Sequence, residues 1–220
     1  MSEKVFITGM GLMTPVGSDL PKSRTAIQQG IDGFSSIQLF DPSRYRCKKA
    51  GLIPTLTADA GRSRASCLLE KVVREAVEQA GWDAEMLSRT PLSVGTTNGG
   101  MFEGECFFRE LQLPAPDHAL CREKAGGYPV SRQMQDLECH LGVLGPKRVF
   151  SNACASGANG IGHAYQMIHH GVWEIALAGG YDALCELSFA GFDCIRSLSP
   201  TYCQPFGRHR NGLLLGEGAG

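Results

Sequence analysis

The sequence lacks the features that mark membrane, nucleic-acid-binding and disulfide-bonded proteins. It contains no run of about 18 apolar residues and no basic-then-apolar leader, which excludes a transmembrane helix and a secretory signal. Its 21 basic and 22 acidic side chains leave a net charge of −1, so no cationic surplus favours nucleic acid. Nine cysteines without a C-x-x-C pair favour reduced thiols over a disulfide framework. We therefore expect a soluble, cytoplasmic protein that binds neither nucleic acid nor membrane.

Motifs for nucleotide and metal binding are also missing. No G-x-x-x-x-G-K-[ST] sequence is present, which argues against a P-loop. Gly9-x-Gly11 lacks the third glycine of a dinucleotide fingerprint. Cys139 and His140 are adjacent, but no second pair gives the spacing of a zinc site. We expect no cofactor and no metal.

What the chain does have is an excess of glycine. Its 28 glycines are about 13% of the 220 residues, against about 7% in an average protein. A hydrophobic content of 43% and a chain of this length are enough to bury about 70% of the unfolded surface without disulfides or metals. The glycines therefore predict a fold that repeatedly needs close backbone approach or positive φ.

Strand and helix patterns alternate along the chain. Short β-branched, aromatic or aliphatic runs that end at small residues predict five strands, at residues 4–9, 92–95, 147–151, 174–179 and 213–215. Helices are predicted at 21–29, 63–80 and 154–170, with mostly helical sequence over 101–145. Residues 34–57 are expected to form a loop with a short hairpin. The alternation predicts an α/β fold with a mostly parallel five-stranded sheet covered by helices.

One cysteine has a setting that suits a nucleophile. Cys154 follows the predicted strand at 147–151 and begins the predicted helix at 154–170. Unpartnered N–H groups and the positive end of the helix dipole favour a thiolate there and lower its pKa. The same N–H groups can hold an oxyanion. The alternative is that Cys154 is a small buried hydrophobic residue, as most cysteines are, and its setting alone leaves the two interpretations equal.

No histidine is placed to act as a base for Cys154. His163 lies nine residues further along the same predicted helix, so it faces the opposite side. The other histidines lie in loops or at helix ends without a partner motif: His118, His140, His169, His170 and His209. A cysteine hydrolase would need such a base, so this class is disfavoured.

Cys154 lies in the stretch Asn152-Ala153-Cys154-Ala155-Ser156-Gly157, and further glycine-containing motifs lie before and after it in order along the chain. Together these motifs resemble the β-ketoacyl-acyl-carrier-protein synthases, which have the thiolase-like fold, and the stretch around Cys154, similar to the family's nucleophile motif, is the most specific of them. The resemblance covers residues 1–220 and implies the N-terminal domain of such a synthase, one half of a duplicated fold, without the C-terminal half. The apolar, glycine-rich end at 213–220 fits a chain cut through its core. The other matching stretches are residues 7–11, 14–17, 40–43, 50–51, 95–100, 177–180, 191–192 and 216–220.

The resemblance implies carbon–carbon bond formation in fatty acid or polyketide-type biosynthesis. Cys154 would accept an acyl group from acyl carrier protein, so the resemblance favours its interpretation as the nucleophile. Malonyl-carrier protein would then lose carbon dioxide, and its carbanion would attack the acyl thioester. The two histidines, the lysine and the phenylalanine loop that the family also uses would lie in the C-terminal half. The implied partners are acyl carrier protein, acyl and malonyl thioesters, and a second subunit in a homodimer or heterodimer of the complete chain.

Five further positions take roles from the resemblance. Phe192 would line the acyl pocket, and Asn98 stands where some members have an apolar gate residue. Arg196, Arg62 and Arg64 would contact the acidic carrier protein. For Arg62 and Arg64, an interpretation as solvated charges on a helix and loop remains equally open.

A second function of a different class also remains open. The chain could be a non-catalytic, truncated or partner subunit that binds acyl chains or carrier protein without condensing them. Condensation needs the histidines and lysine of the C-terminal half, so this chain alone is expected to be inactive even if Cys154 is reactive. Glu217, in the glycine-rich end, could be a catalytic acid, but the resemblance implies that this segment is chiefly structural.

Overall fold

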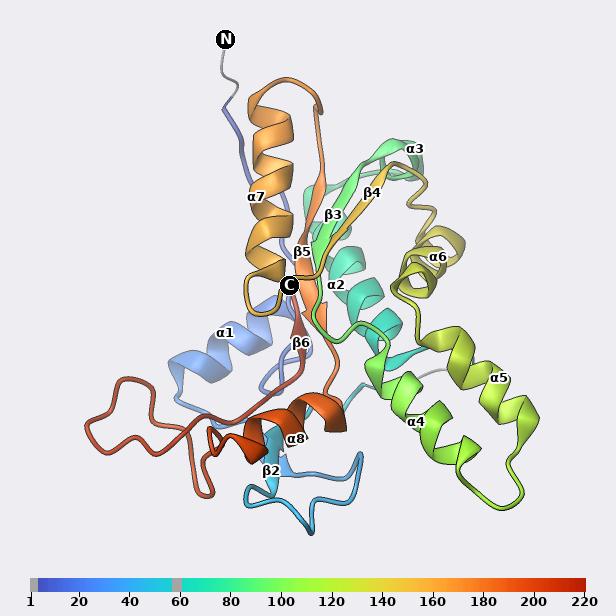
Figure 1. Cartoon of the computed structure of the whole chain (residues 1–220). Coiled ribbons are helices and arrows are strands. Elements are labelled where there is room, and N and C mark those ends of the chain that lie inside the picture. Colours follow the sequence, from blue (N-terminus) through green and yellow to red (C-terminus); the bar gives the residue numbers. More distant parts are fainter. Residues whose placement is uncertain (1–3, 57–60) are drawn as a thin grey trace.

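The computed structural model describes residues 4–56 and 61–220, and a mixed sheet lies at its centre. The strand order is β4–β3–β5–β6, with β3, β4 and β5 parallel and β6 antiparallel to β5 (Figure 1). A separate antiparallel pair joins β1 to β2. The strands are β1 Phe34–Ser36, β2 Lys49–Gly51, β3 Leu92–Gly95, β4 Lys147–Phe150, β5 Leu177–Asp182 and β6 Gly218–Ala219.

Helices cover the sheet, as the sequence predicts. Figure 1 shows α7 on one side of the central strands and α2 on the other. The expected α/β architecture is therefore confirmed. The helices are α1 Leu20–Gln28, α2 Arg64–Ala80, α3 Ala84–Arg89, α4 Met101–Leu111, α5 His118–Gly127, α6 Val130–Leu141, α7 Ser156–His169 and α8 Glu186–Cys194.

Local sequence signals set the limits of α2. The hydroxyl of Ser63 accepts the N–H of Ser66 at 2.9 Å and caps the first turn. Gly81 ends the helix in the left-handed conformation with φ 67°, which glycine adopts without strain. The apolar side chains Leu68, Leu69 and Val72 are buried against the sheet. The helix predicted at 63–80 is confirmed.

Glycine lets α7 pack directly on the sheet backbone. A Cβ on Gly160 would lie 2.9 Å from the carbonyl oxygen of Gly179 and 3.0 Å from that of Ser93. A Cβ on Gly95 would lie 1.9 Å from the carbonyl carbon of Ser156. Neither position has room for a side chain, so these two glycines allow close contact between a helix and two strands.

The opening strand predicted at residues 4–9 is wrong. These residues form no strand, and the side chains of Phe6 and Ile7 are 75% and 81% exposed. The segment joins the sheet at Met13, which exchanges two backbone hydrogen bonds with Ala219. Because no strand lies beside Ile7, nothing fixes it in the sheet. The sheet therefore has four strands in the part of the chain described, not five.

Several other boundaries differ from the prediction. Strand β5 lies three residues later than the predicted strand at 174–179. Residues 213–215 form no strand beyond an isolated bridge at Leu213, and β6 follows them. Helices α3 and α8 were not predicted. Helix α7 begins at Ser156, so Cys154 lies just before the helix and not inside it.

Candidate active site

Cys154 lies in an exposed turn between β4 and α7. The hydroxyl of Ser156 closes this turn by donating to the carbonyl of Ala153 at 2.7 Å and accepting the N–H of Asn152 at 2.9 Å. Within the described residues Cys154 is therefore exposed, unlike Cys47, Cys67, Cys121 and Cys185, which are buried. By contrast, burial raises the pKa of the Cys185 thiol, which disfavours a reactive thiolate there.

The backbone before Cys154 is strained. Ala153 has φ 59°, a conformation that costs an L-residue about 1–2 kcal/mol. Such strain is often found at functional sites, where the surrounding structure holds it. Here the Ser156 hydroxyl bonds on both sides of Ala153 supply that support. The sequence alone gave no signal of the left-handed residue.

Free N–H groups follow the thiol. The hydrogen bond that starts α7 runs from the N–H of Asn159 to the carbonyl of Ala155. The N–H groups of Gly157 and Ala158 therefore have no acceptor within the helix. They lie at the positive end of the helix dipole, where negative charge is stabilised. This arrangement suits an oxyanion that forms when a thiol attacks a carbonyl carbon.

The turn lies at the edge where the parallel strands end. The carboxyl ends of β3, β4 and β5 meet there, and open parallel sheets bind ligands at such an edge. Asp182, at the end of β5, accepts the hydroxyl of Thr96 at 2.7 Å and the N–H groups of Thr97 and Asn98 at 2.9 and 2.7 Å. Asp182 thus fixes the loop after β3, and sequence reasoning missed it, although an aspartate directly after a strand was the available signal.

Asn98, predicted at the acyl gate, lies in this loop at the same edge as the Cys154 turn. Its side-chain amide donates to the carbonyl of Ala183 at 3.1 Å, and its side-chain oxygen accepts the hydroxyl of Ser188 at 2.6 Å. Both polar ends of Asn98 therefore bond the chain after β5, one at Ala183 before α8 and one at Ser188 within α8. Its role in substrate binding stays a prediction.

Phe192, predicted to line an acyl pocket, is half-buried on α8. It packs against an apolar cluster whose centre is Phe189, and the rings of Phe40 and Tyr45 lie 5.5 and 5.4 Å from that of Phe189. The helix follows β5 and so lies beyond the same sheet edge. The packing shows a core contact, and the acyl contact of Phe192 stays a prediction.

The three arginines predicted to contact carrier protein have different environments. Arg64 is buried, with its Nε 2.8 Å from Oε2 of the fully buried Glu217 and its Nη1 2.7 Å from the carbonyl of Leu56. The prediction for Arg64 is wrong, because this charge is used inside the fold. Arg62 is half-buried and pairs with Glu70. Arg196 is exposed, with φ 58°.

Glu217 has the structural role expected of it. Besides Arg64, it accepts the N–H of Ile53 at 2.8 Å and that of Leu184 at 3.3 Å. It therefore joins three segments far apart in the sequence. Removing one partner of such a buried pair leaves an uncompensated charge, which costs about 3–5 kcal/mol.

His163 lies within α7, and its predicted orientation away from Cys154 stays a prediction. Its ring packs against Phe150 and Trp173, and its Nδ1 lies 3.2 Å from the hydroxyl of Ser93. Within residues 4–56 and 61–220, no three His, Cys, Asp or Glu side chains are grouped to hold a metal ion. In the same residues, no helix has the length and apolar character to cross a membrane.

Comparison with known families identifies the fold and its relatives. The family model "Beta-ketoacyl synthase, N-terminal domain" matches residues 2–220. The 3-oxoacyl-[acyl-carrier-protein] synthase 2 of Staphylococcus aureus (strain COL) is 28% identical over 240 residues, covering 100% of this chain and 56% of the relative. A putative polyketide β-ketoacyl synthase 1 of Streptomyces cyaneus is 28% identical over 253 residues, covering 100% and 57%. The chain thus spans about half the length of these relatives.

Solved structures share this fold. The ishigamide ketosynthase/chain length factor superposes with a TM-score of 0.89 at 24% identity, covering 100% of this chain and 58% of the other. A type II polyketide ketosynthase solved with its acyl-carrier protein, AntDE:AntF, gives a TM-score of 0.82 at 21% identity, with coverage of 100% and 57%. These similarities confirm the thiolase-like α/β fold that the sequence motifs implied.

Proposed function

The chain belongs to the β-ketoacyl synthase N-terminal domain family, and on that premise we propose that Cys154 accepts the acyl group in a ketosynthase reaction. The Cys154 sulfur attacks the carbonyl carbon of an acyl thioester. The bond from that carbon to the carrier sulfur breaks, and the carrier leaves as a thiol with the proton that Cys154 gave up. The acyl group is then held as a thioester on the protein.

The observation that carries this proposal is the exposed Cys154 turn above the first turn of α7. The thiol is open to solvent, and the N–H groups of Gly157 and Ala158 have no acceptor within α7. Donors of this kind stabilise the oxyanion of acyl transfer, and loss of one costs about 10²–10³ in rate in known enzymes. The residues around the thiol are small, which leaves room for an acyl chain.

Condensation is assigned to the complete synthase. There, malonyl-carrier protein loses carbon dioxide and the resulting carbanion attacks the Cys154 thioester, giving a β-ketoacyl product in fatty acid or polyketide-type synthesis. We assign the acyl-acceptor step alone to residues 1–220. Phe192 and Asn98 are proposed to border the acyl chain.

The proposed partners also rest on membership in the β-ketoacyl synthase family. Acyl carrier protein delivers the acyl and malonyl groups, and the exposed Arg196 is the arginine best placed to meet its acidic surface. Arg62 is a secondary candidate, because its guanidinium already pairs with Glu70. The complete synthase is proposed to act in the cytoplasm as a homodimer or heterodimer.

Acyl transfer to the intact chain tests the proposal. The chain is incubated with octanoyl-pantetheine, and the modified residue is found by intact-mass and peptide mass spectrometry. We expect Cys154 to be acylated at least ~10-fold faster than Cys139 and Cys194, because of these three exposed cysteines it is Cys154 that lies just before the free N–H groups of a helix. Cys154→Ser should abolish the adduct, whereas Cys139→Ser, which removes another exposed thiol, should leave it unchanged.

Two outcomes contradict the proposal. Equal acylation of Cys139, Cys154 and Cys194 shows that the turn does not activate Cys154. If no adduct forms but a separate binding assay shows that the chain binds acyl carrier protein, the chain is instead the non-catalytic subunit.

A further inference from the structure

The β3–α4 loop, residues 96–99, begins beside the Cys154 turn. Its first N–H donates to the carbonyl of Phe150, the last residue of β4, at 3.0 Å. The residue before the loop, Gly95, lies so close to Ser156 that a Cβ on it would be 1.9 Å from the Ser156 carbonyl carbon. The loop therefore leaves the sheet in contact with the first turn of α7, where the free N–H groups lie.

The other end of the loop is joined to α8. The side-chain oxygen of Asn98 accepts the hydroxyl of Ser188, within α8, at 2.6 Å. Helix α4 follows the loop, and its Glu105 accepts the first N–H groups of α8, those of Glu186 and Leu187, at 2.9 and 2.5 Å. A carboxylate in this position stabilises a helix N-terminus. The loop, α4 and α8 are thus connected by hydrogen bonds beyond the carboxyl ends of the strands.

Asp182 joins the loop to the sheet through a single oxygen atom. Its Oδ1 accepts the hydroxyl of Thr96 at 2.7 Å and the N–H groups of Thr97 and Asn98 at 2.9 and 2.7 Å. The Thr96 oxygen in turn accepts the N–H of Gly99 at 2.9 Å. The backbone of Asp182 is itself paired with β6. One carboxylate oxygen, held at a fixed point of the sheet, therefore sets the position of three successive loop residues.

The loop depends on this oxygen for its shape. Without it, the hydroxyl of Thr96 and the N–H groups of Thr97 and Asn98 lose the acceptor that they share. Leaving such donors unpaired costs free energy, so the loop would shift to find other partners. A shift would also move Asn98 relative to Ser188, because both bonds of Asn98 to the chain after β5 depend on its position.

We propose that Asp182 is a positioning residue that determines acyl-chain specificity. It holds the β3–α4 loop in place as one wall of the acyl site, and so sets how well a long acyl thioester binds beside Cys154 compared with a short one. This inference rests on the proposed function. A wall that is already fixed binds an apolar chain without the free-energy cost of ordering the loop. An acetyl group has only two carbons and makes little use of such a wall.

Acylation of Cys154 by two thioesters tests this role. The rate of adduct formation is measured by intact-mass spectrometry against the concentration of octanoyl-pantetheine and of acetyl-pantetheine. The proteins are the parent chain, Asp182→Ala and Asp182→Asn. Asparagine keeps a side-chain oxygen that can accept the same three hydrogen bonds but carries no charge, so it separates the geometry of the acceptor from its charge.

Asp83→Ala is the matched control. The Asp83 carboxylate also accepts a backbone N–H, that of Met86 at 2.8 Å, and caps α3. Helix α3 precedes β3, so it lies at the opposite end of that strand from the loop (Figure 1). The control therefore loses a carboxylate acceptor and some stability, but at a distance from the Cys154 turn.

We expect Asp182→Ala to raise the half-saturating concentration of octanoyl-pantetheine at least ~10-fold and that of acetyl-pantetheine less than ~3-fold. Asp182→Asn should stay within ~3-fold of the parent for both thioesters, because the three bonds are kept. Asp83→Ala should leave both values unchanged. If Asp182→Ala does not fold, Thr96→Val replaces it, because it removes one of the three donors, and the octanoyl value should again rise more than the acetyl value.

Four results overturn the role of Asp182 while leaving the Cys154 adduct in place. They are an equal rise for both thioesters, no change for either, an Asp182→Asn variant as impaired as Asp182→Ala, and a selective loss of octanoyl binding in Asp83→Ala. A parent chain that forms no adduct with either thioester contradicts the proposed function itself, and the specificity role is then wrong as well.

Discussion

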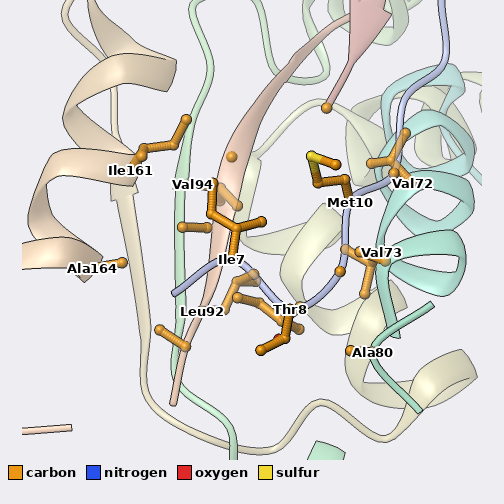
Figure 2. Close-up of a pocket in the computed structure, with 18 of the residues that line it drawn as sticks. Ile7, Thr8, Met10, Val72, Val73, Ala80, Leu92, Val94, Ile161 and Ala164 are labelled. Atoms are coloured by element: carbon orange, nitrogen blue, oxygen red, sulfur yellow. The ribbon is translucent and has the colours of Figure 1, made fainter. Parts of the chain in front are cut away.

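Strand β5 pairs with β3 along one edge from Leu177 to Gly180, and its opposite edge differs between its two ends. At its carboxyl half, Tyr181 and Asp182 pair with β6, and Asp182 also anchors the loop after β3 through three hydrogen bonds. At its amino half, Leu177 and Ala178 line an apolar slot of about 590 Å³ between β5 and residues 5–12, shown in Figure 2. This edge of β5 is therefore paired at its carboxyl end and unpaired at its amino end, within a strand of six residues.

Residues 5–13, the N-terminal segment that runs beside β5 and β6, show how this difference in strand pairing changes the burial of side chains. Met13, opposite Ala219, is completely buried, whereas Ile7 is 81% exposed. The two residues lie on the same segment and differ in whether a strand lies beside them. Burial here is decided by strand pairing far along the chain and not by the apolar character of the segment itself.

The largest expected effect separates the two ends of this segment. Met13→Ala should lower the free energy of unfolding by about 2–5 kcal/mol, because it leaves a cavity in the core. Ile7→Ala should change it by less than about 0.5 kcal/mol, because the Ile7 side chain is exposed. Urea denaturation of both variants and the parent measures the two values. Equal losses would show that the slot is closed in solution and would remove the distinction between the two halves.

A smaller effect is expected where α7 meets the sheet. Gly160→Ala should destabilise the protein by about 1–3 kcal/mol, because its Cβ would press on the carbonyls of Gly179 and Ser93. The matched control is Gly162→Ala, on the same helix, where a Cβ meets nothing within 4 Å. That change should stabilise by up to about 1 kcal/mol through helix propensity.

Thermal or urea unfolding distinguishes the two glycine variants. Changes in unfolding free energy of opposite sign for Gly160→Ala and Gly162→Ala would locate the tight packing of α7 at the paired part of the sheet. A stabilising Gly160→Ala would show that α7 does not rest on the strand backbones. The acyl-acceptor turn would then lack the rigid support described for it.

Local signals made most of the fold predictable. Ser63 and Gly81 marked the limits of α2, and the strand before Cys154 was placed correctly within a residue. The family motif around Cys154 likewise placed the nucleophile candidate between β4 and α7. Such features depend on residues close in the sequence, so a single sequence can reveal them.

Features that depend on distant partners were missed. Arg64 was interpreted as a surface charge because nothing near it indicates burial, and its partner Glu217 lies 153 residues later. Residues 4–9 have the pattern of a buried strand, yet the strand that would bury them is not beside them. Asp182 was missed for the same reason, since its donors come from the loop after β3.

The smallest expected effect concerns the side chain of Glu103, a buried carboxylate with one oxygen that lacks a hydrogen bond among the described residues. Glu103 of α4 is buried, and one oxygen accepts the N–H of Arg64 at 2.9 Å, while Oε2 has no hydrogen-bond partner within residues 4–56 and 61–220. Burial raises the pKa of Glu103 from its ordinary value of 4.5, outweighing the hydrogen bond from Arg64, which lowers it. Above pH 4.5 the folded state therefore holds a proton that the unfolded state has lost, and stability falls as pH rises through the raised pKa.

Glu103→Gln removes this titration and keeps an acceptor for the Arg64 N–H. Near neutral pH the variant should be more stable than the parent by on the order of 1 kcal/mol, because a charged, unpaired oxygen no longer has to be buried. The advantage should shrink toward pH 4.5, where the Glu103 carboxyl of the parent is protonated when folded. Urea denaturation from pH 4.5 to 8 measures this, with Glu123→Gln on the exposed side of α5 as the control. A gap between Glu103→Gln and the parent that stays constant with pH would contradict a raised pKa at Glu103.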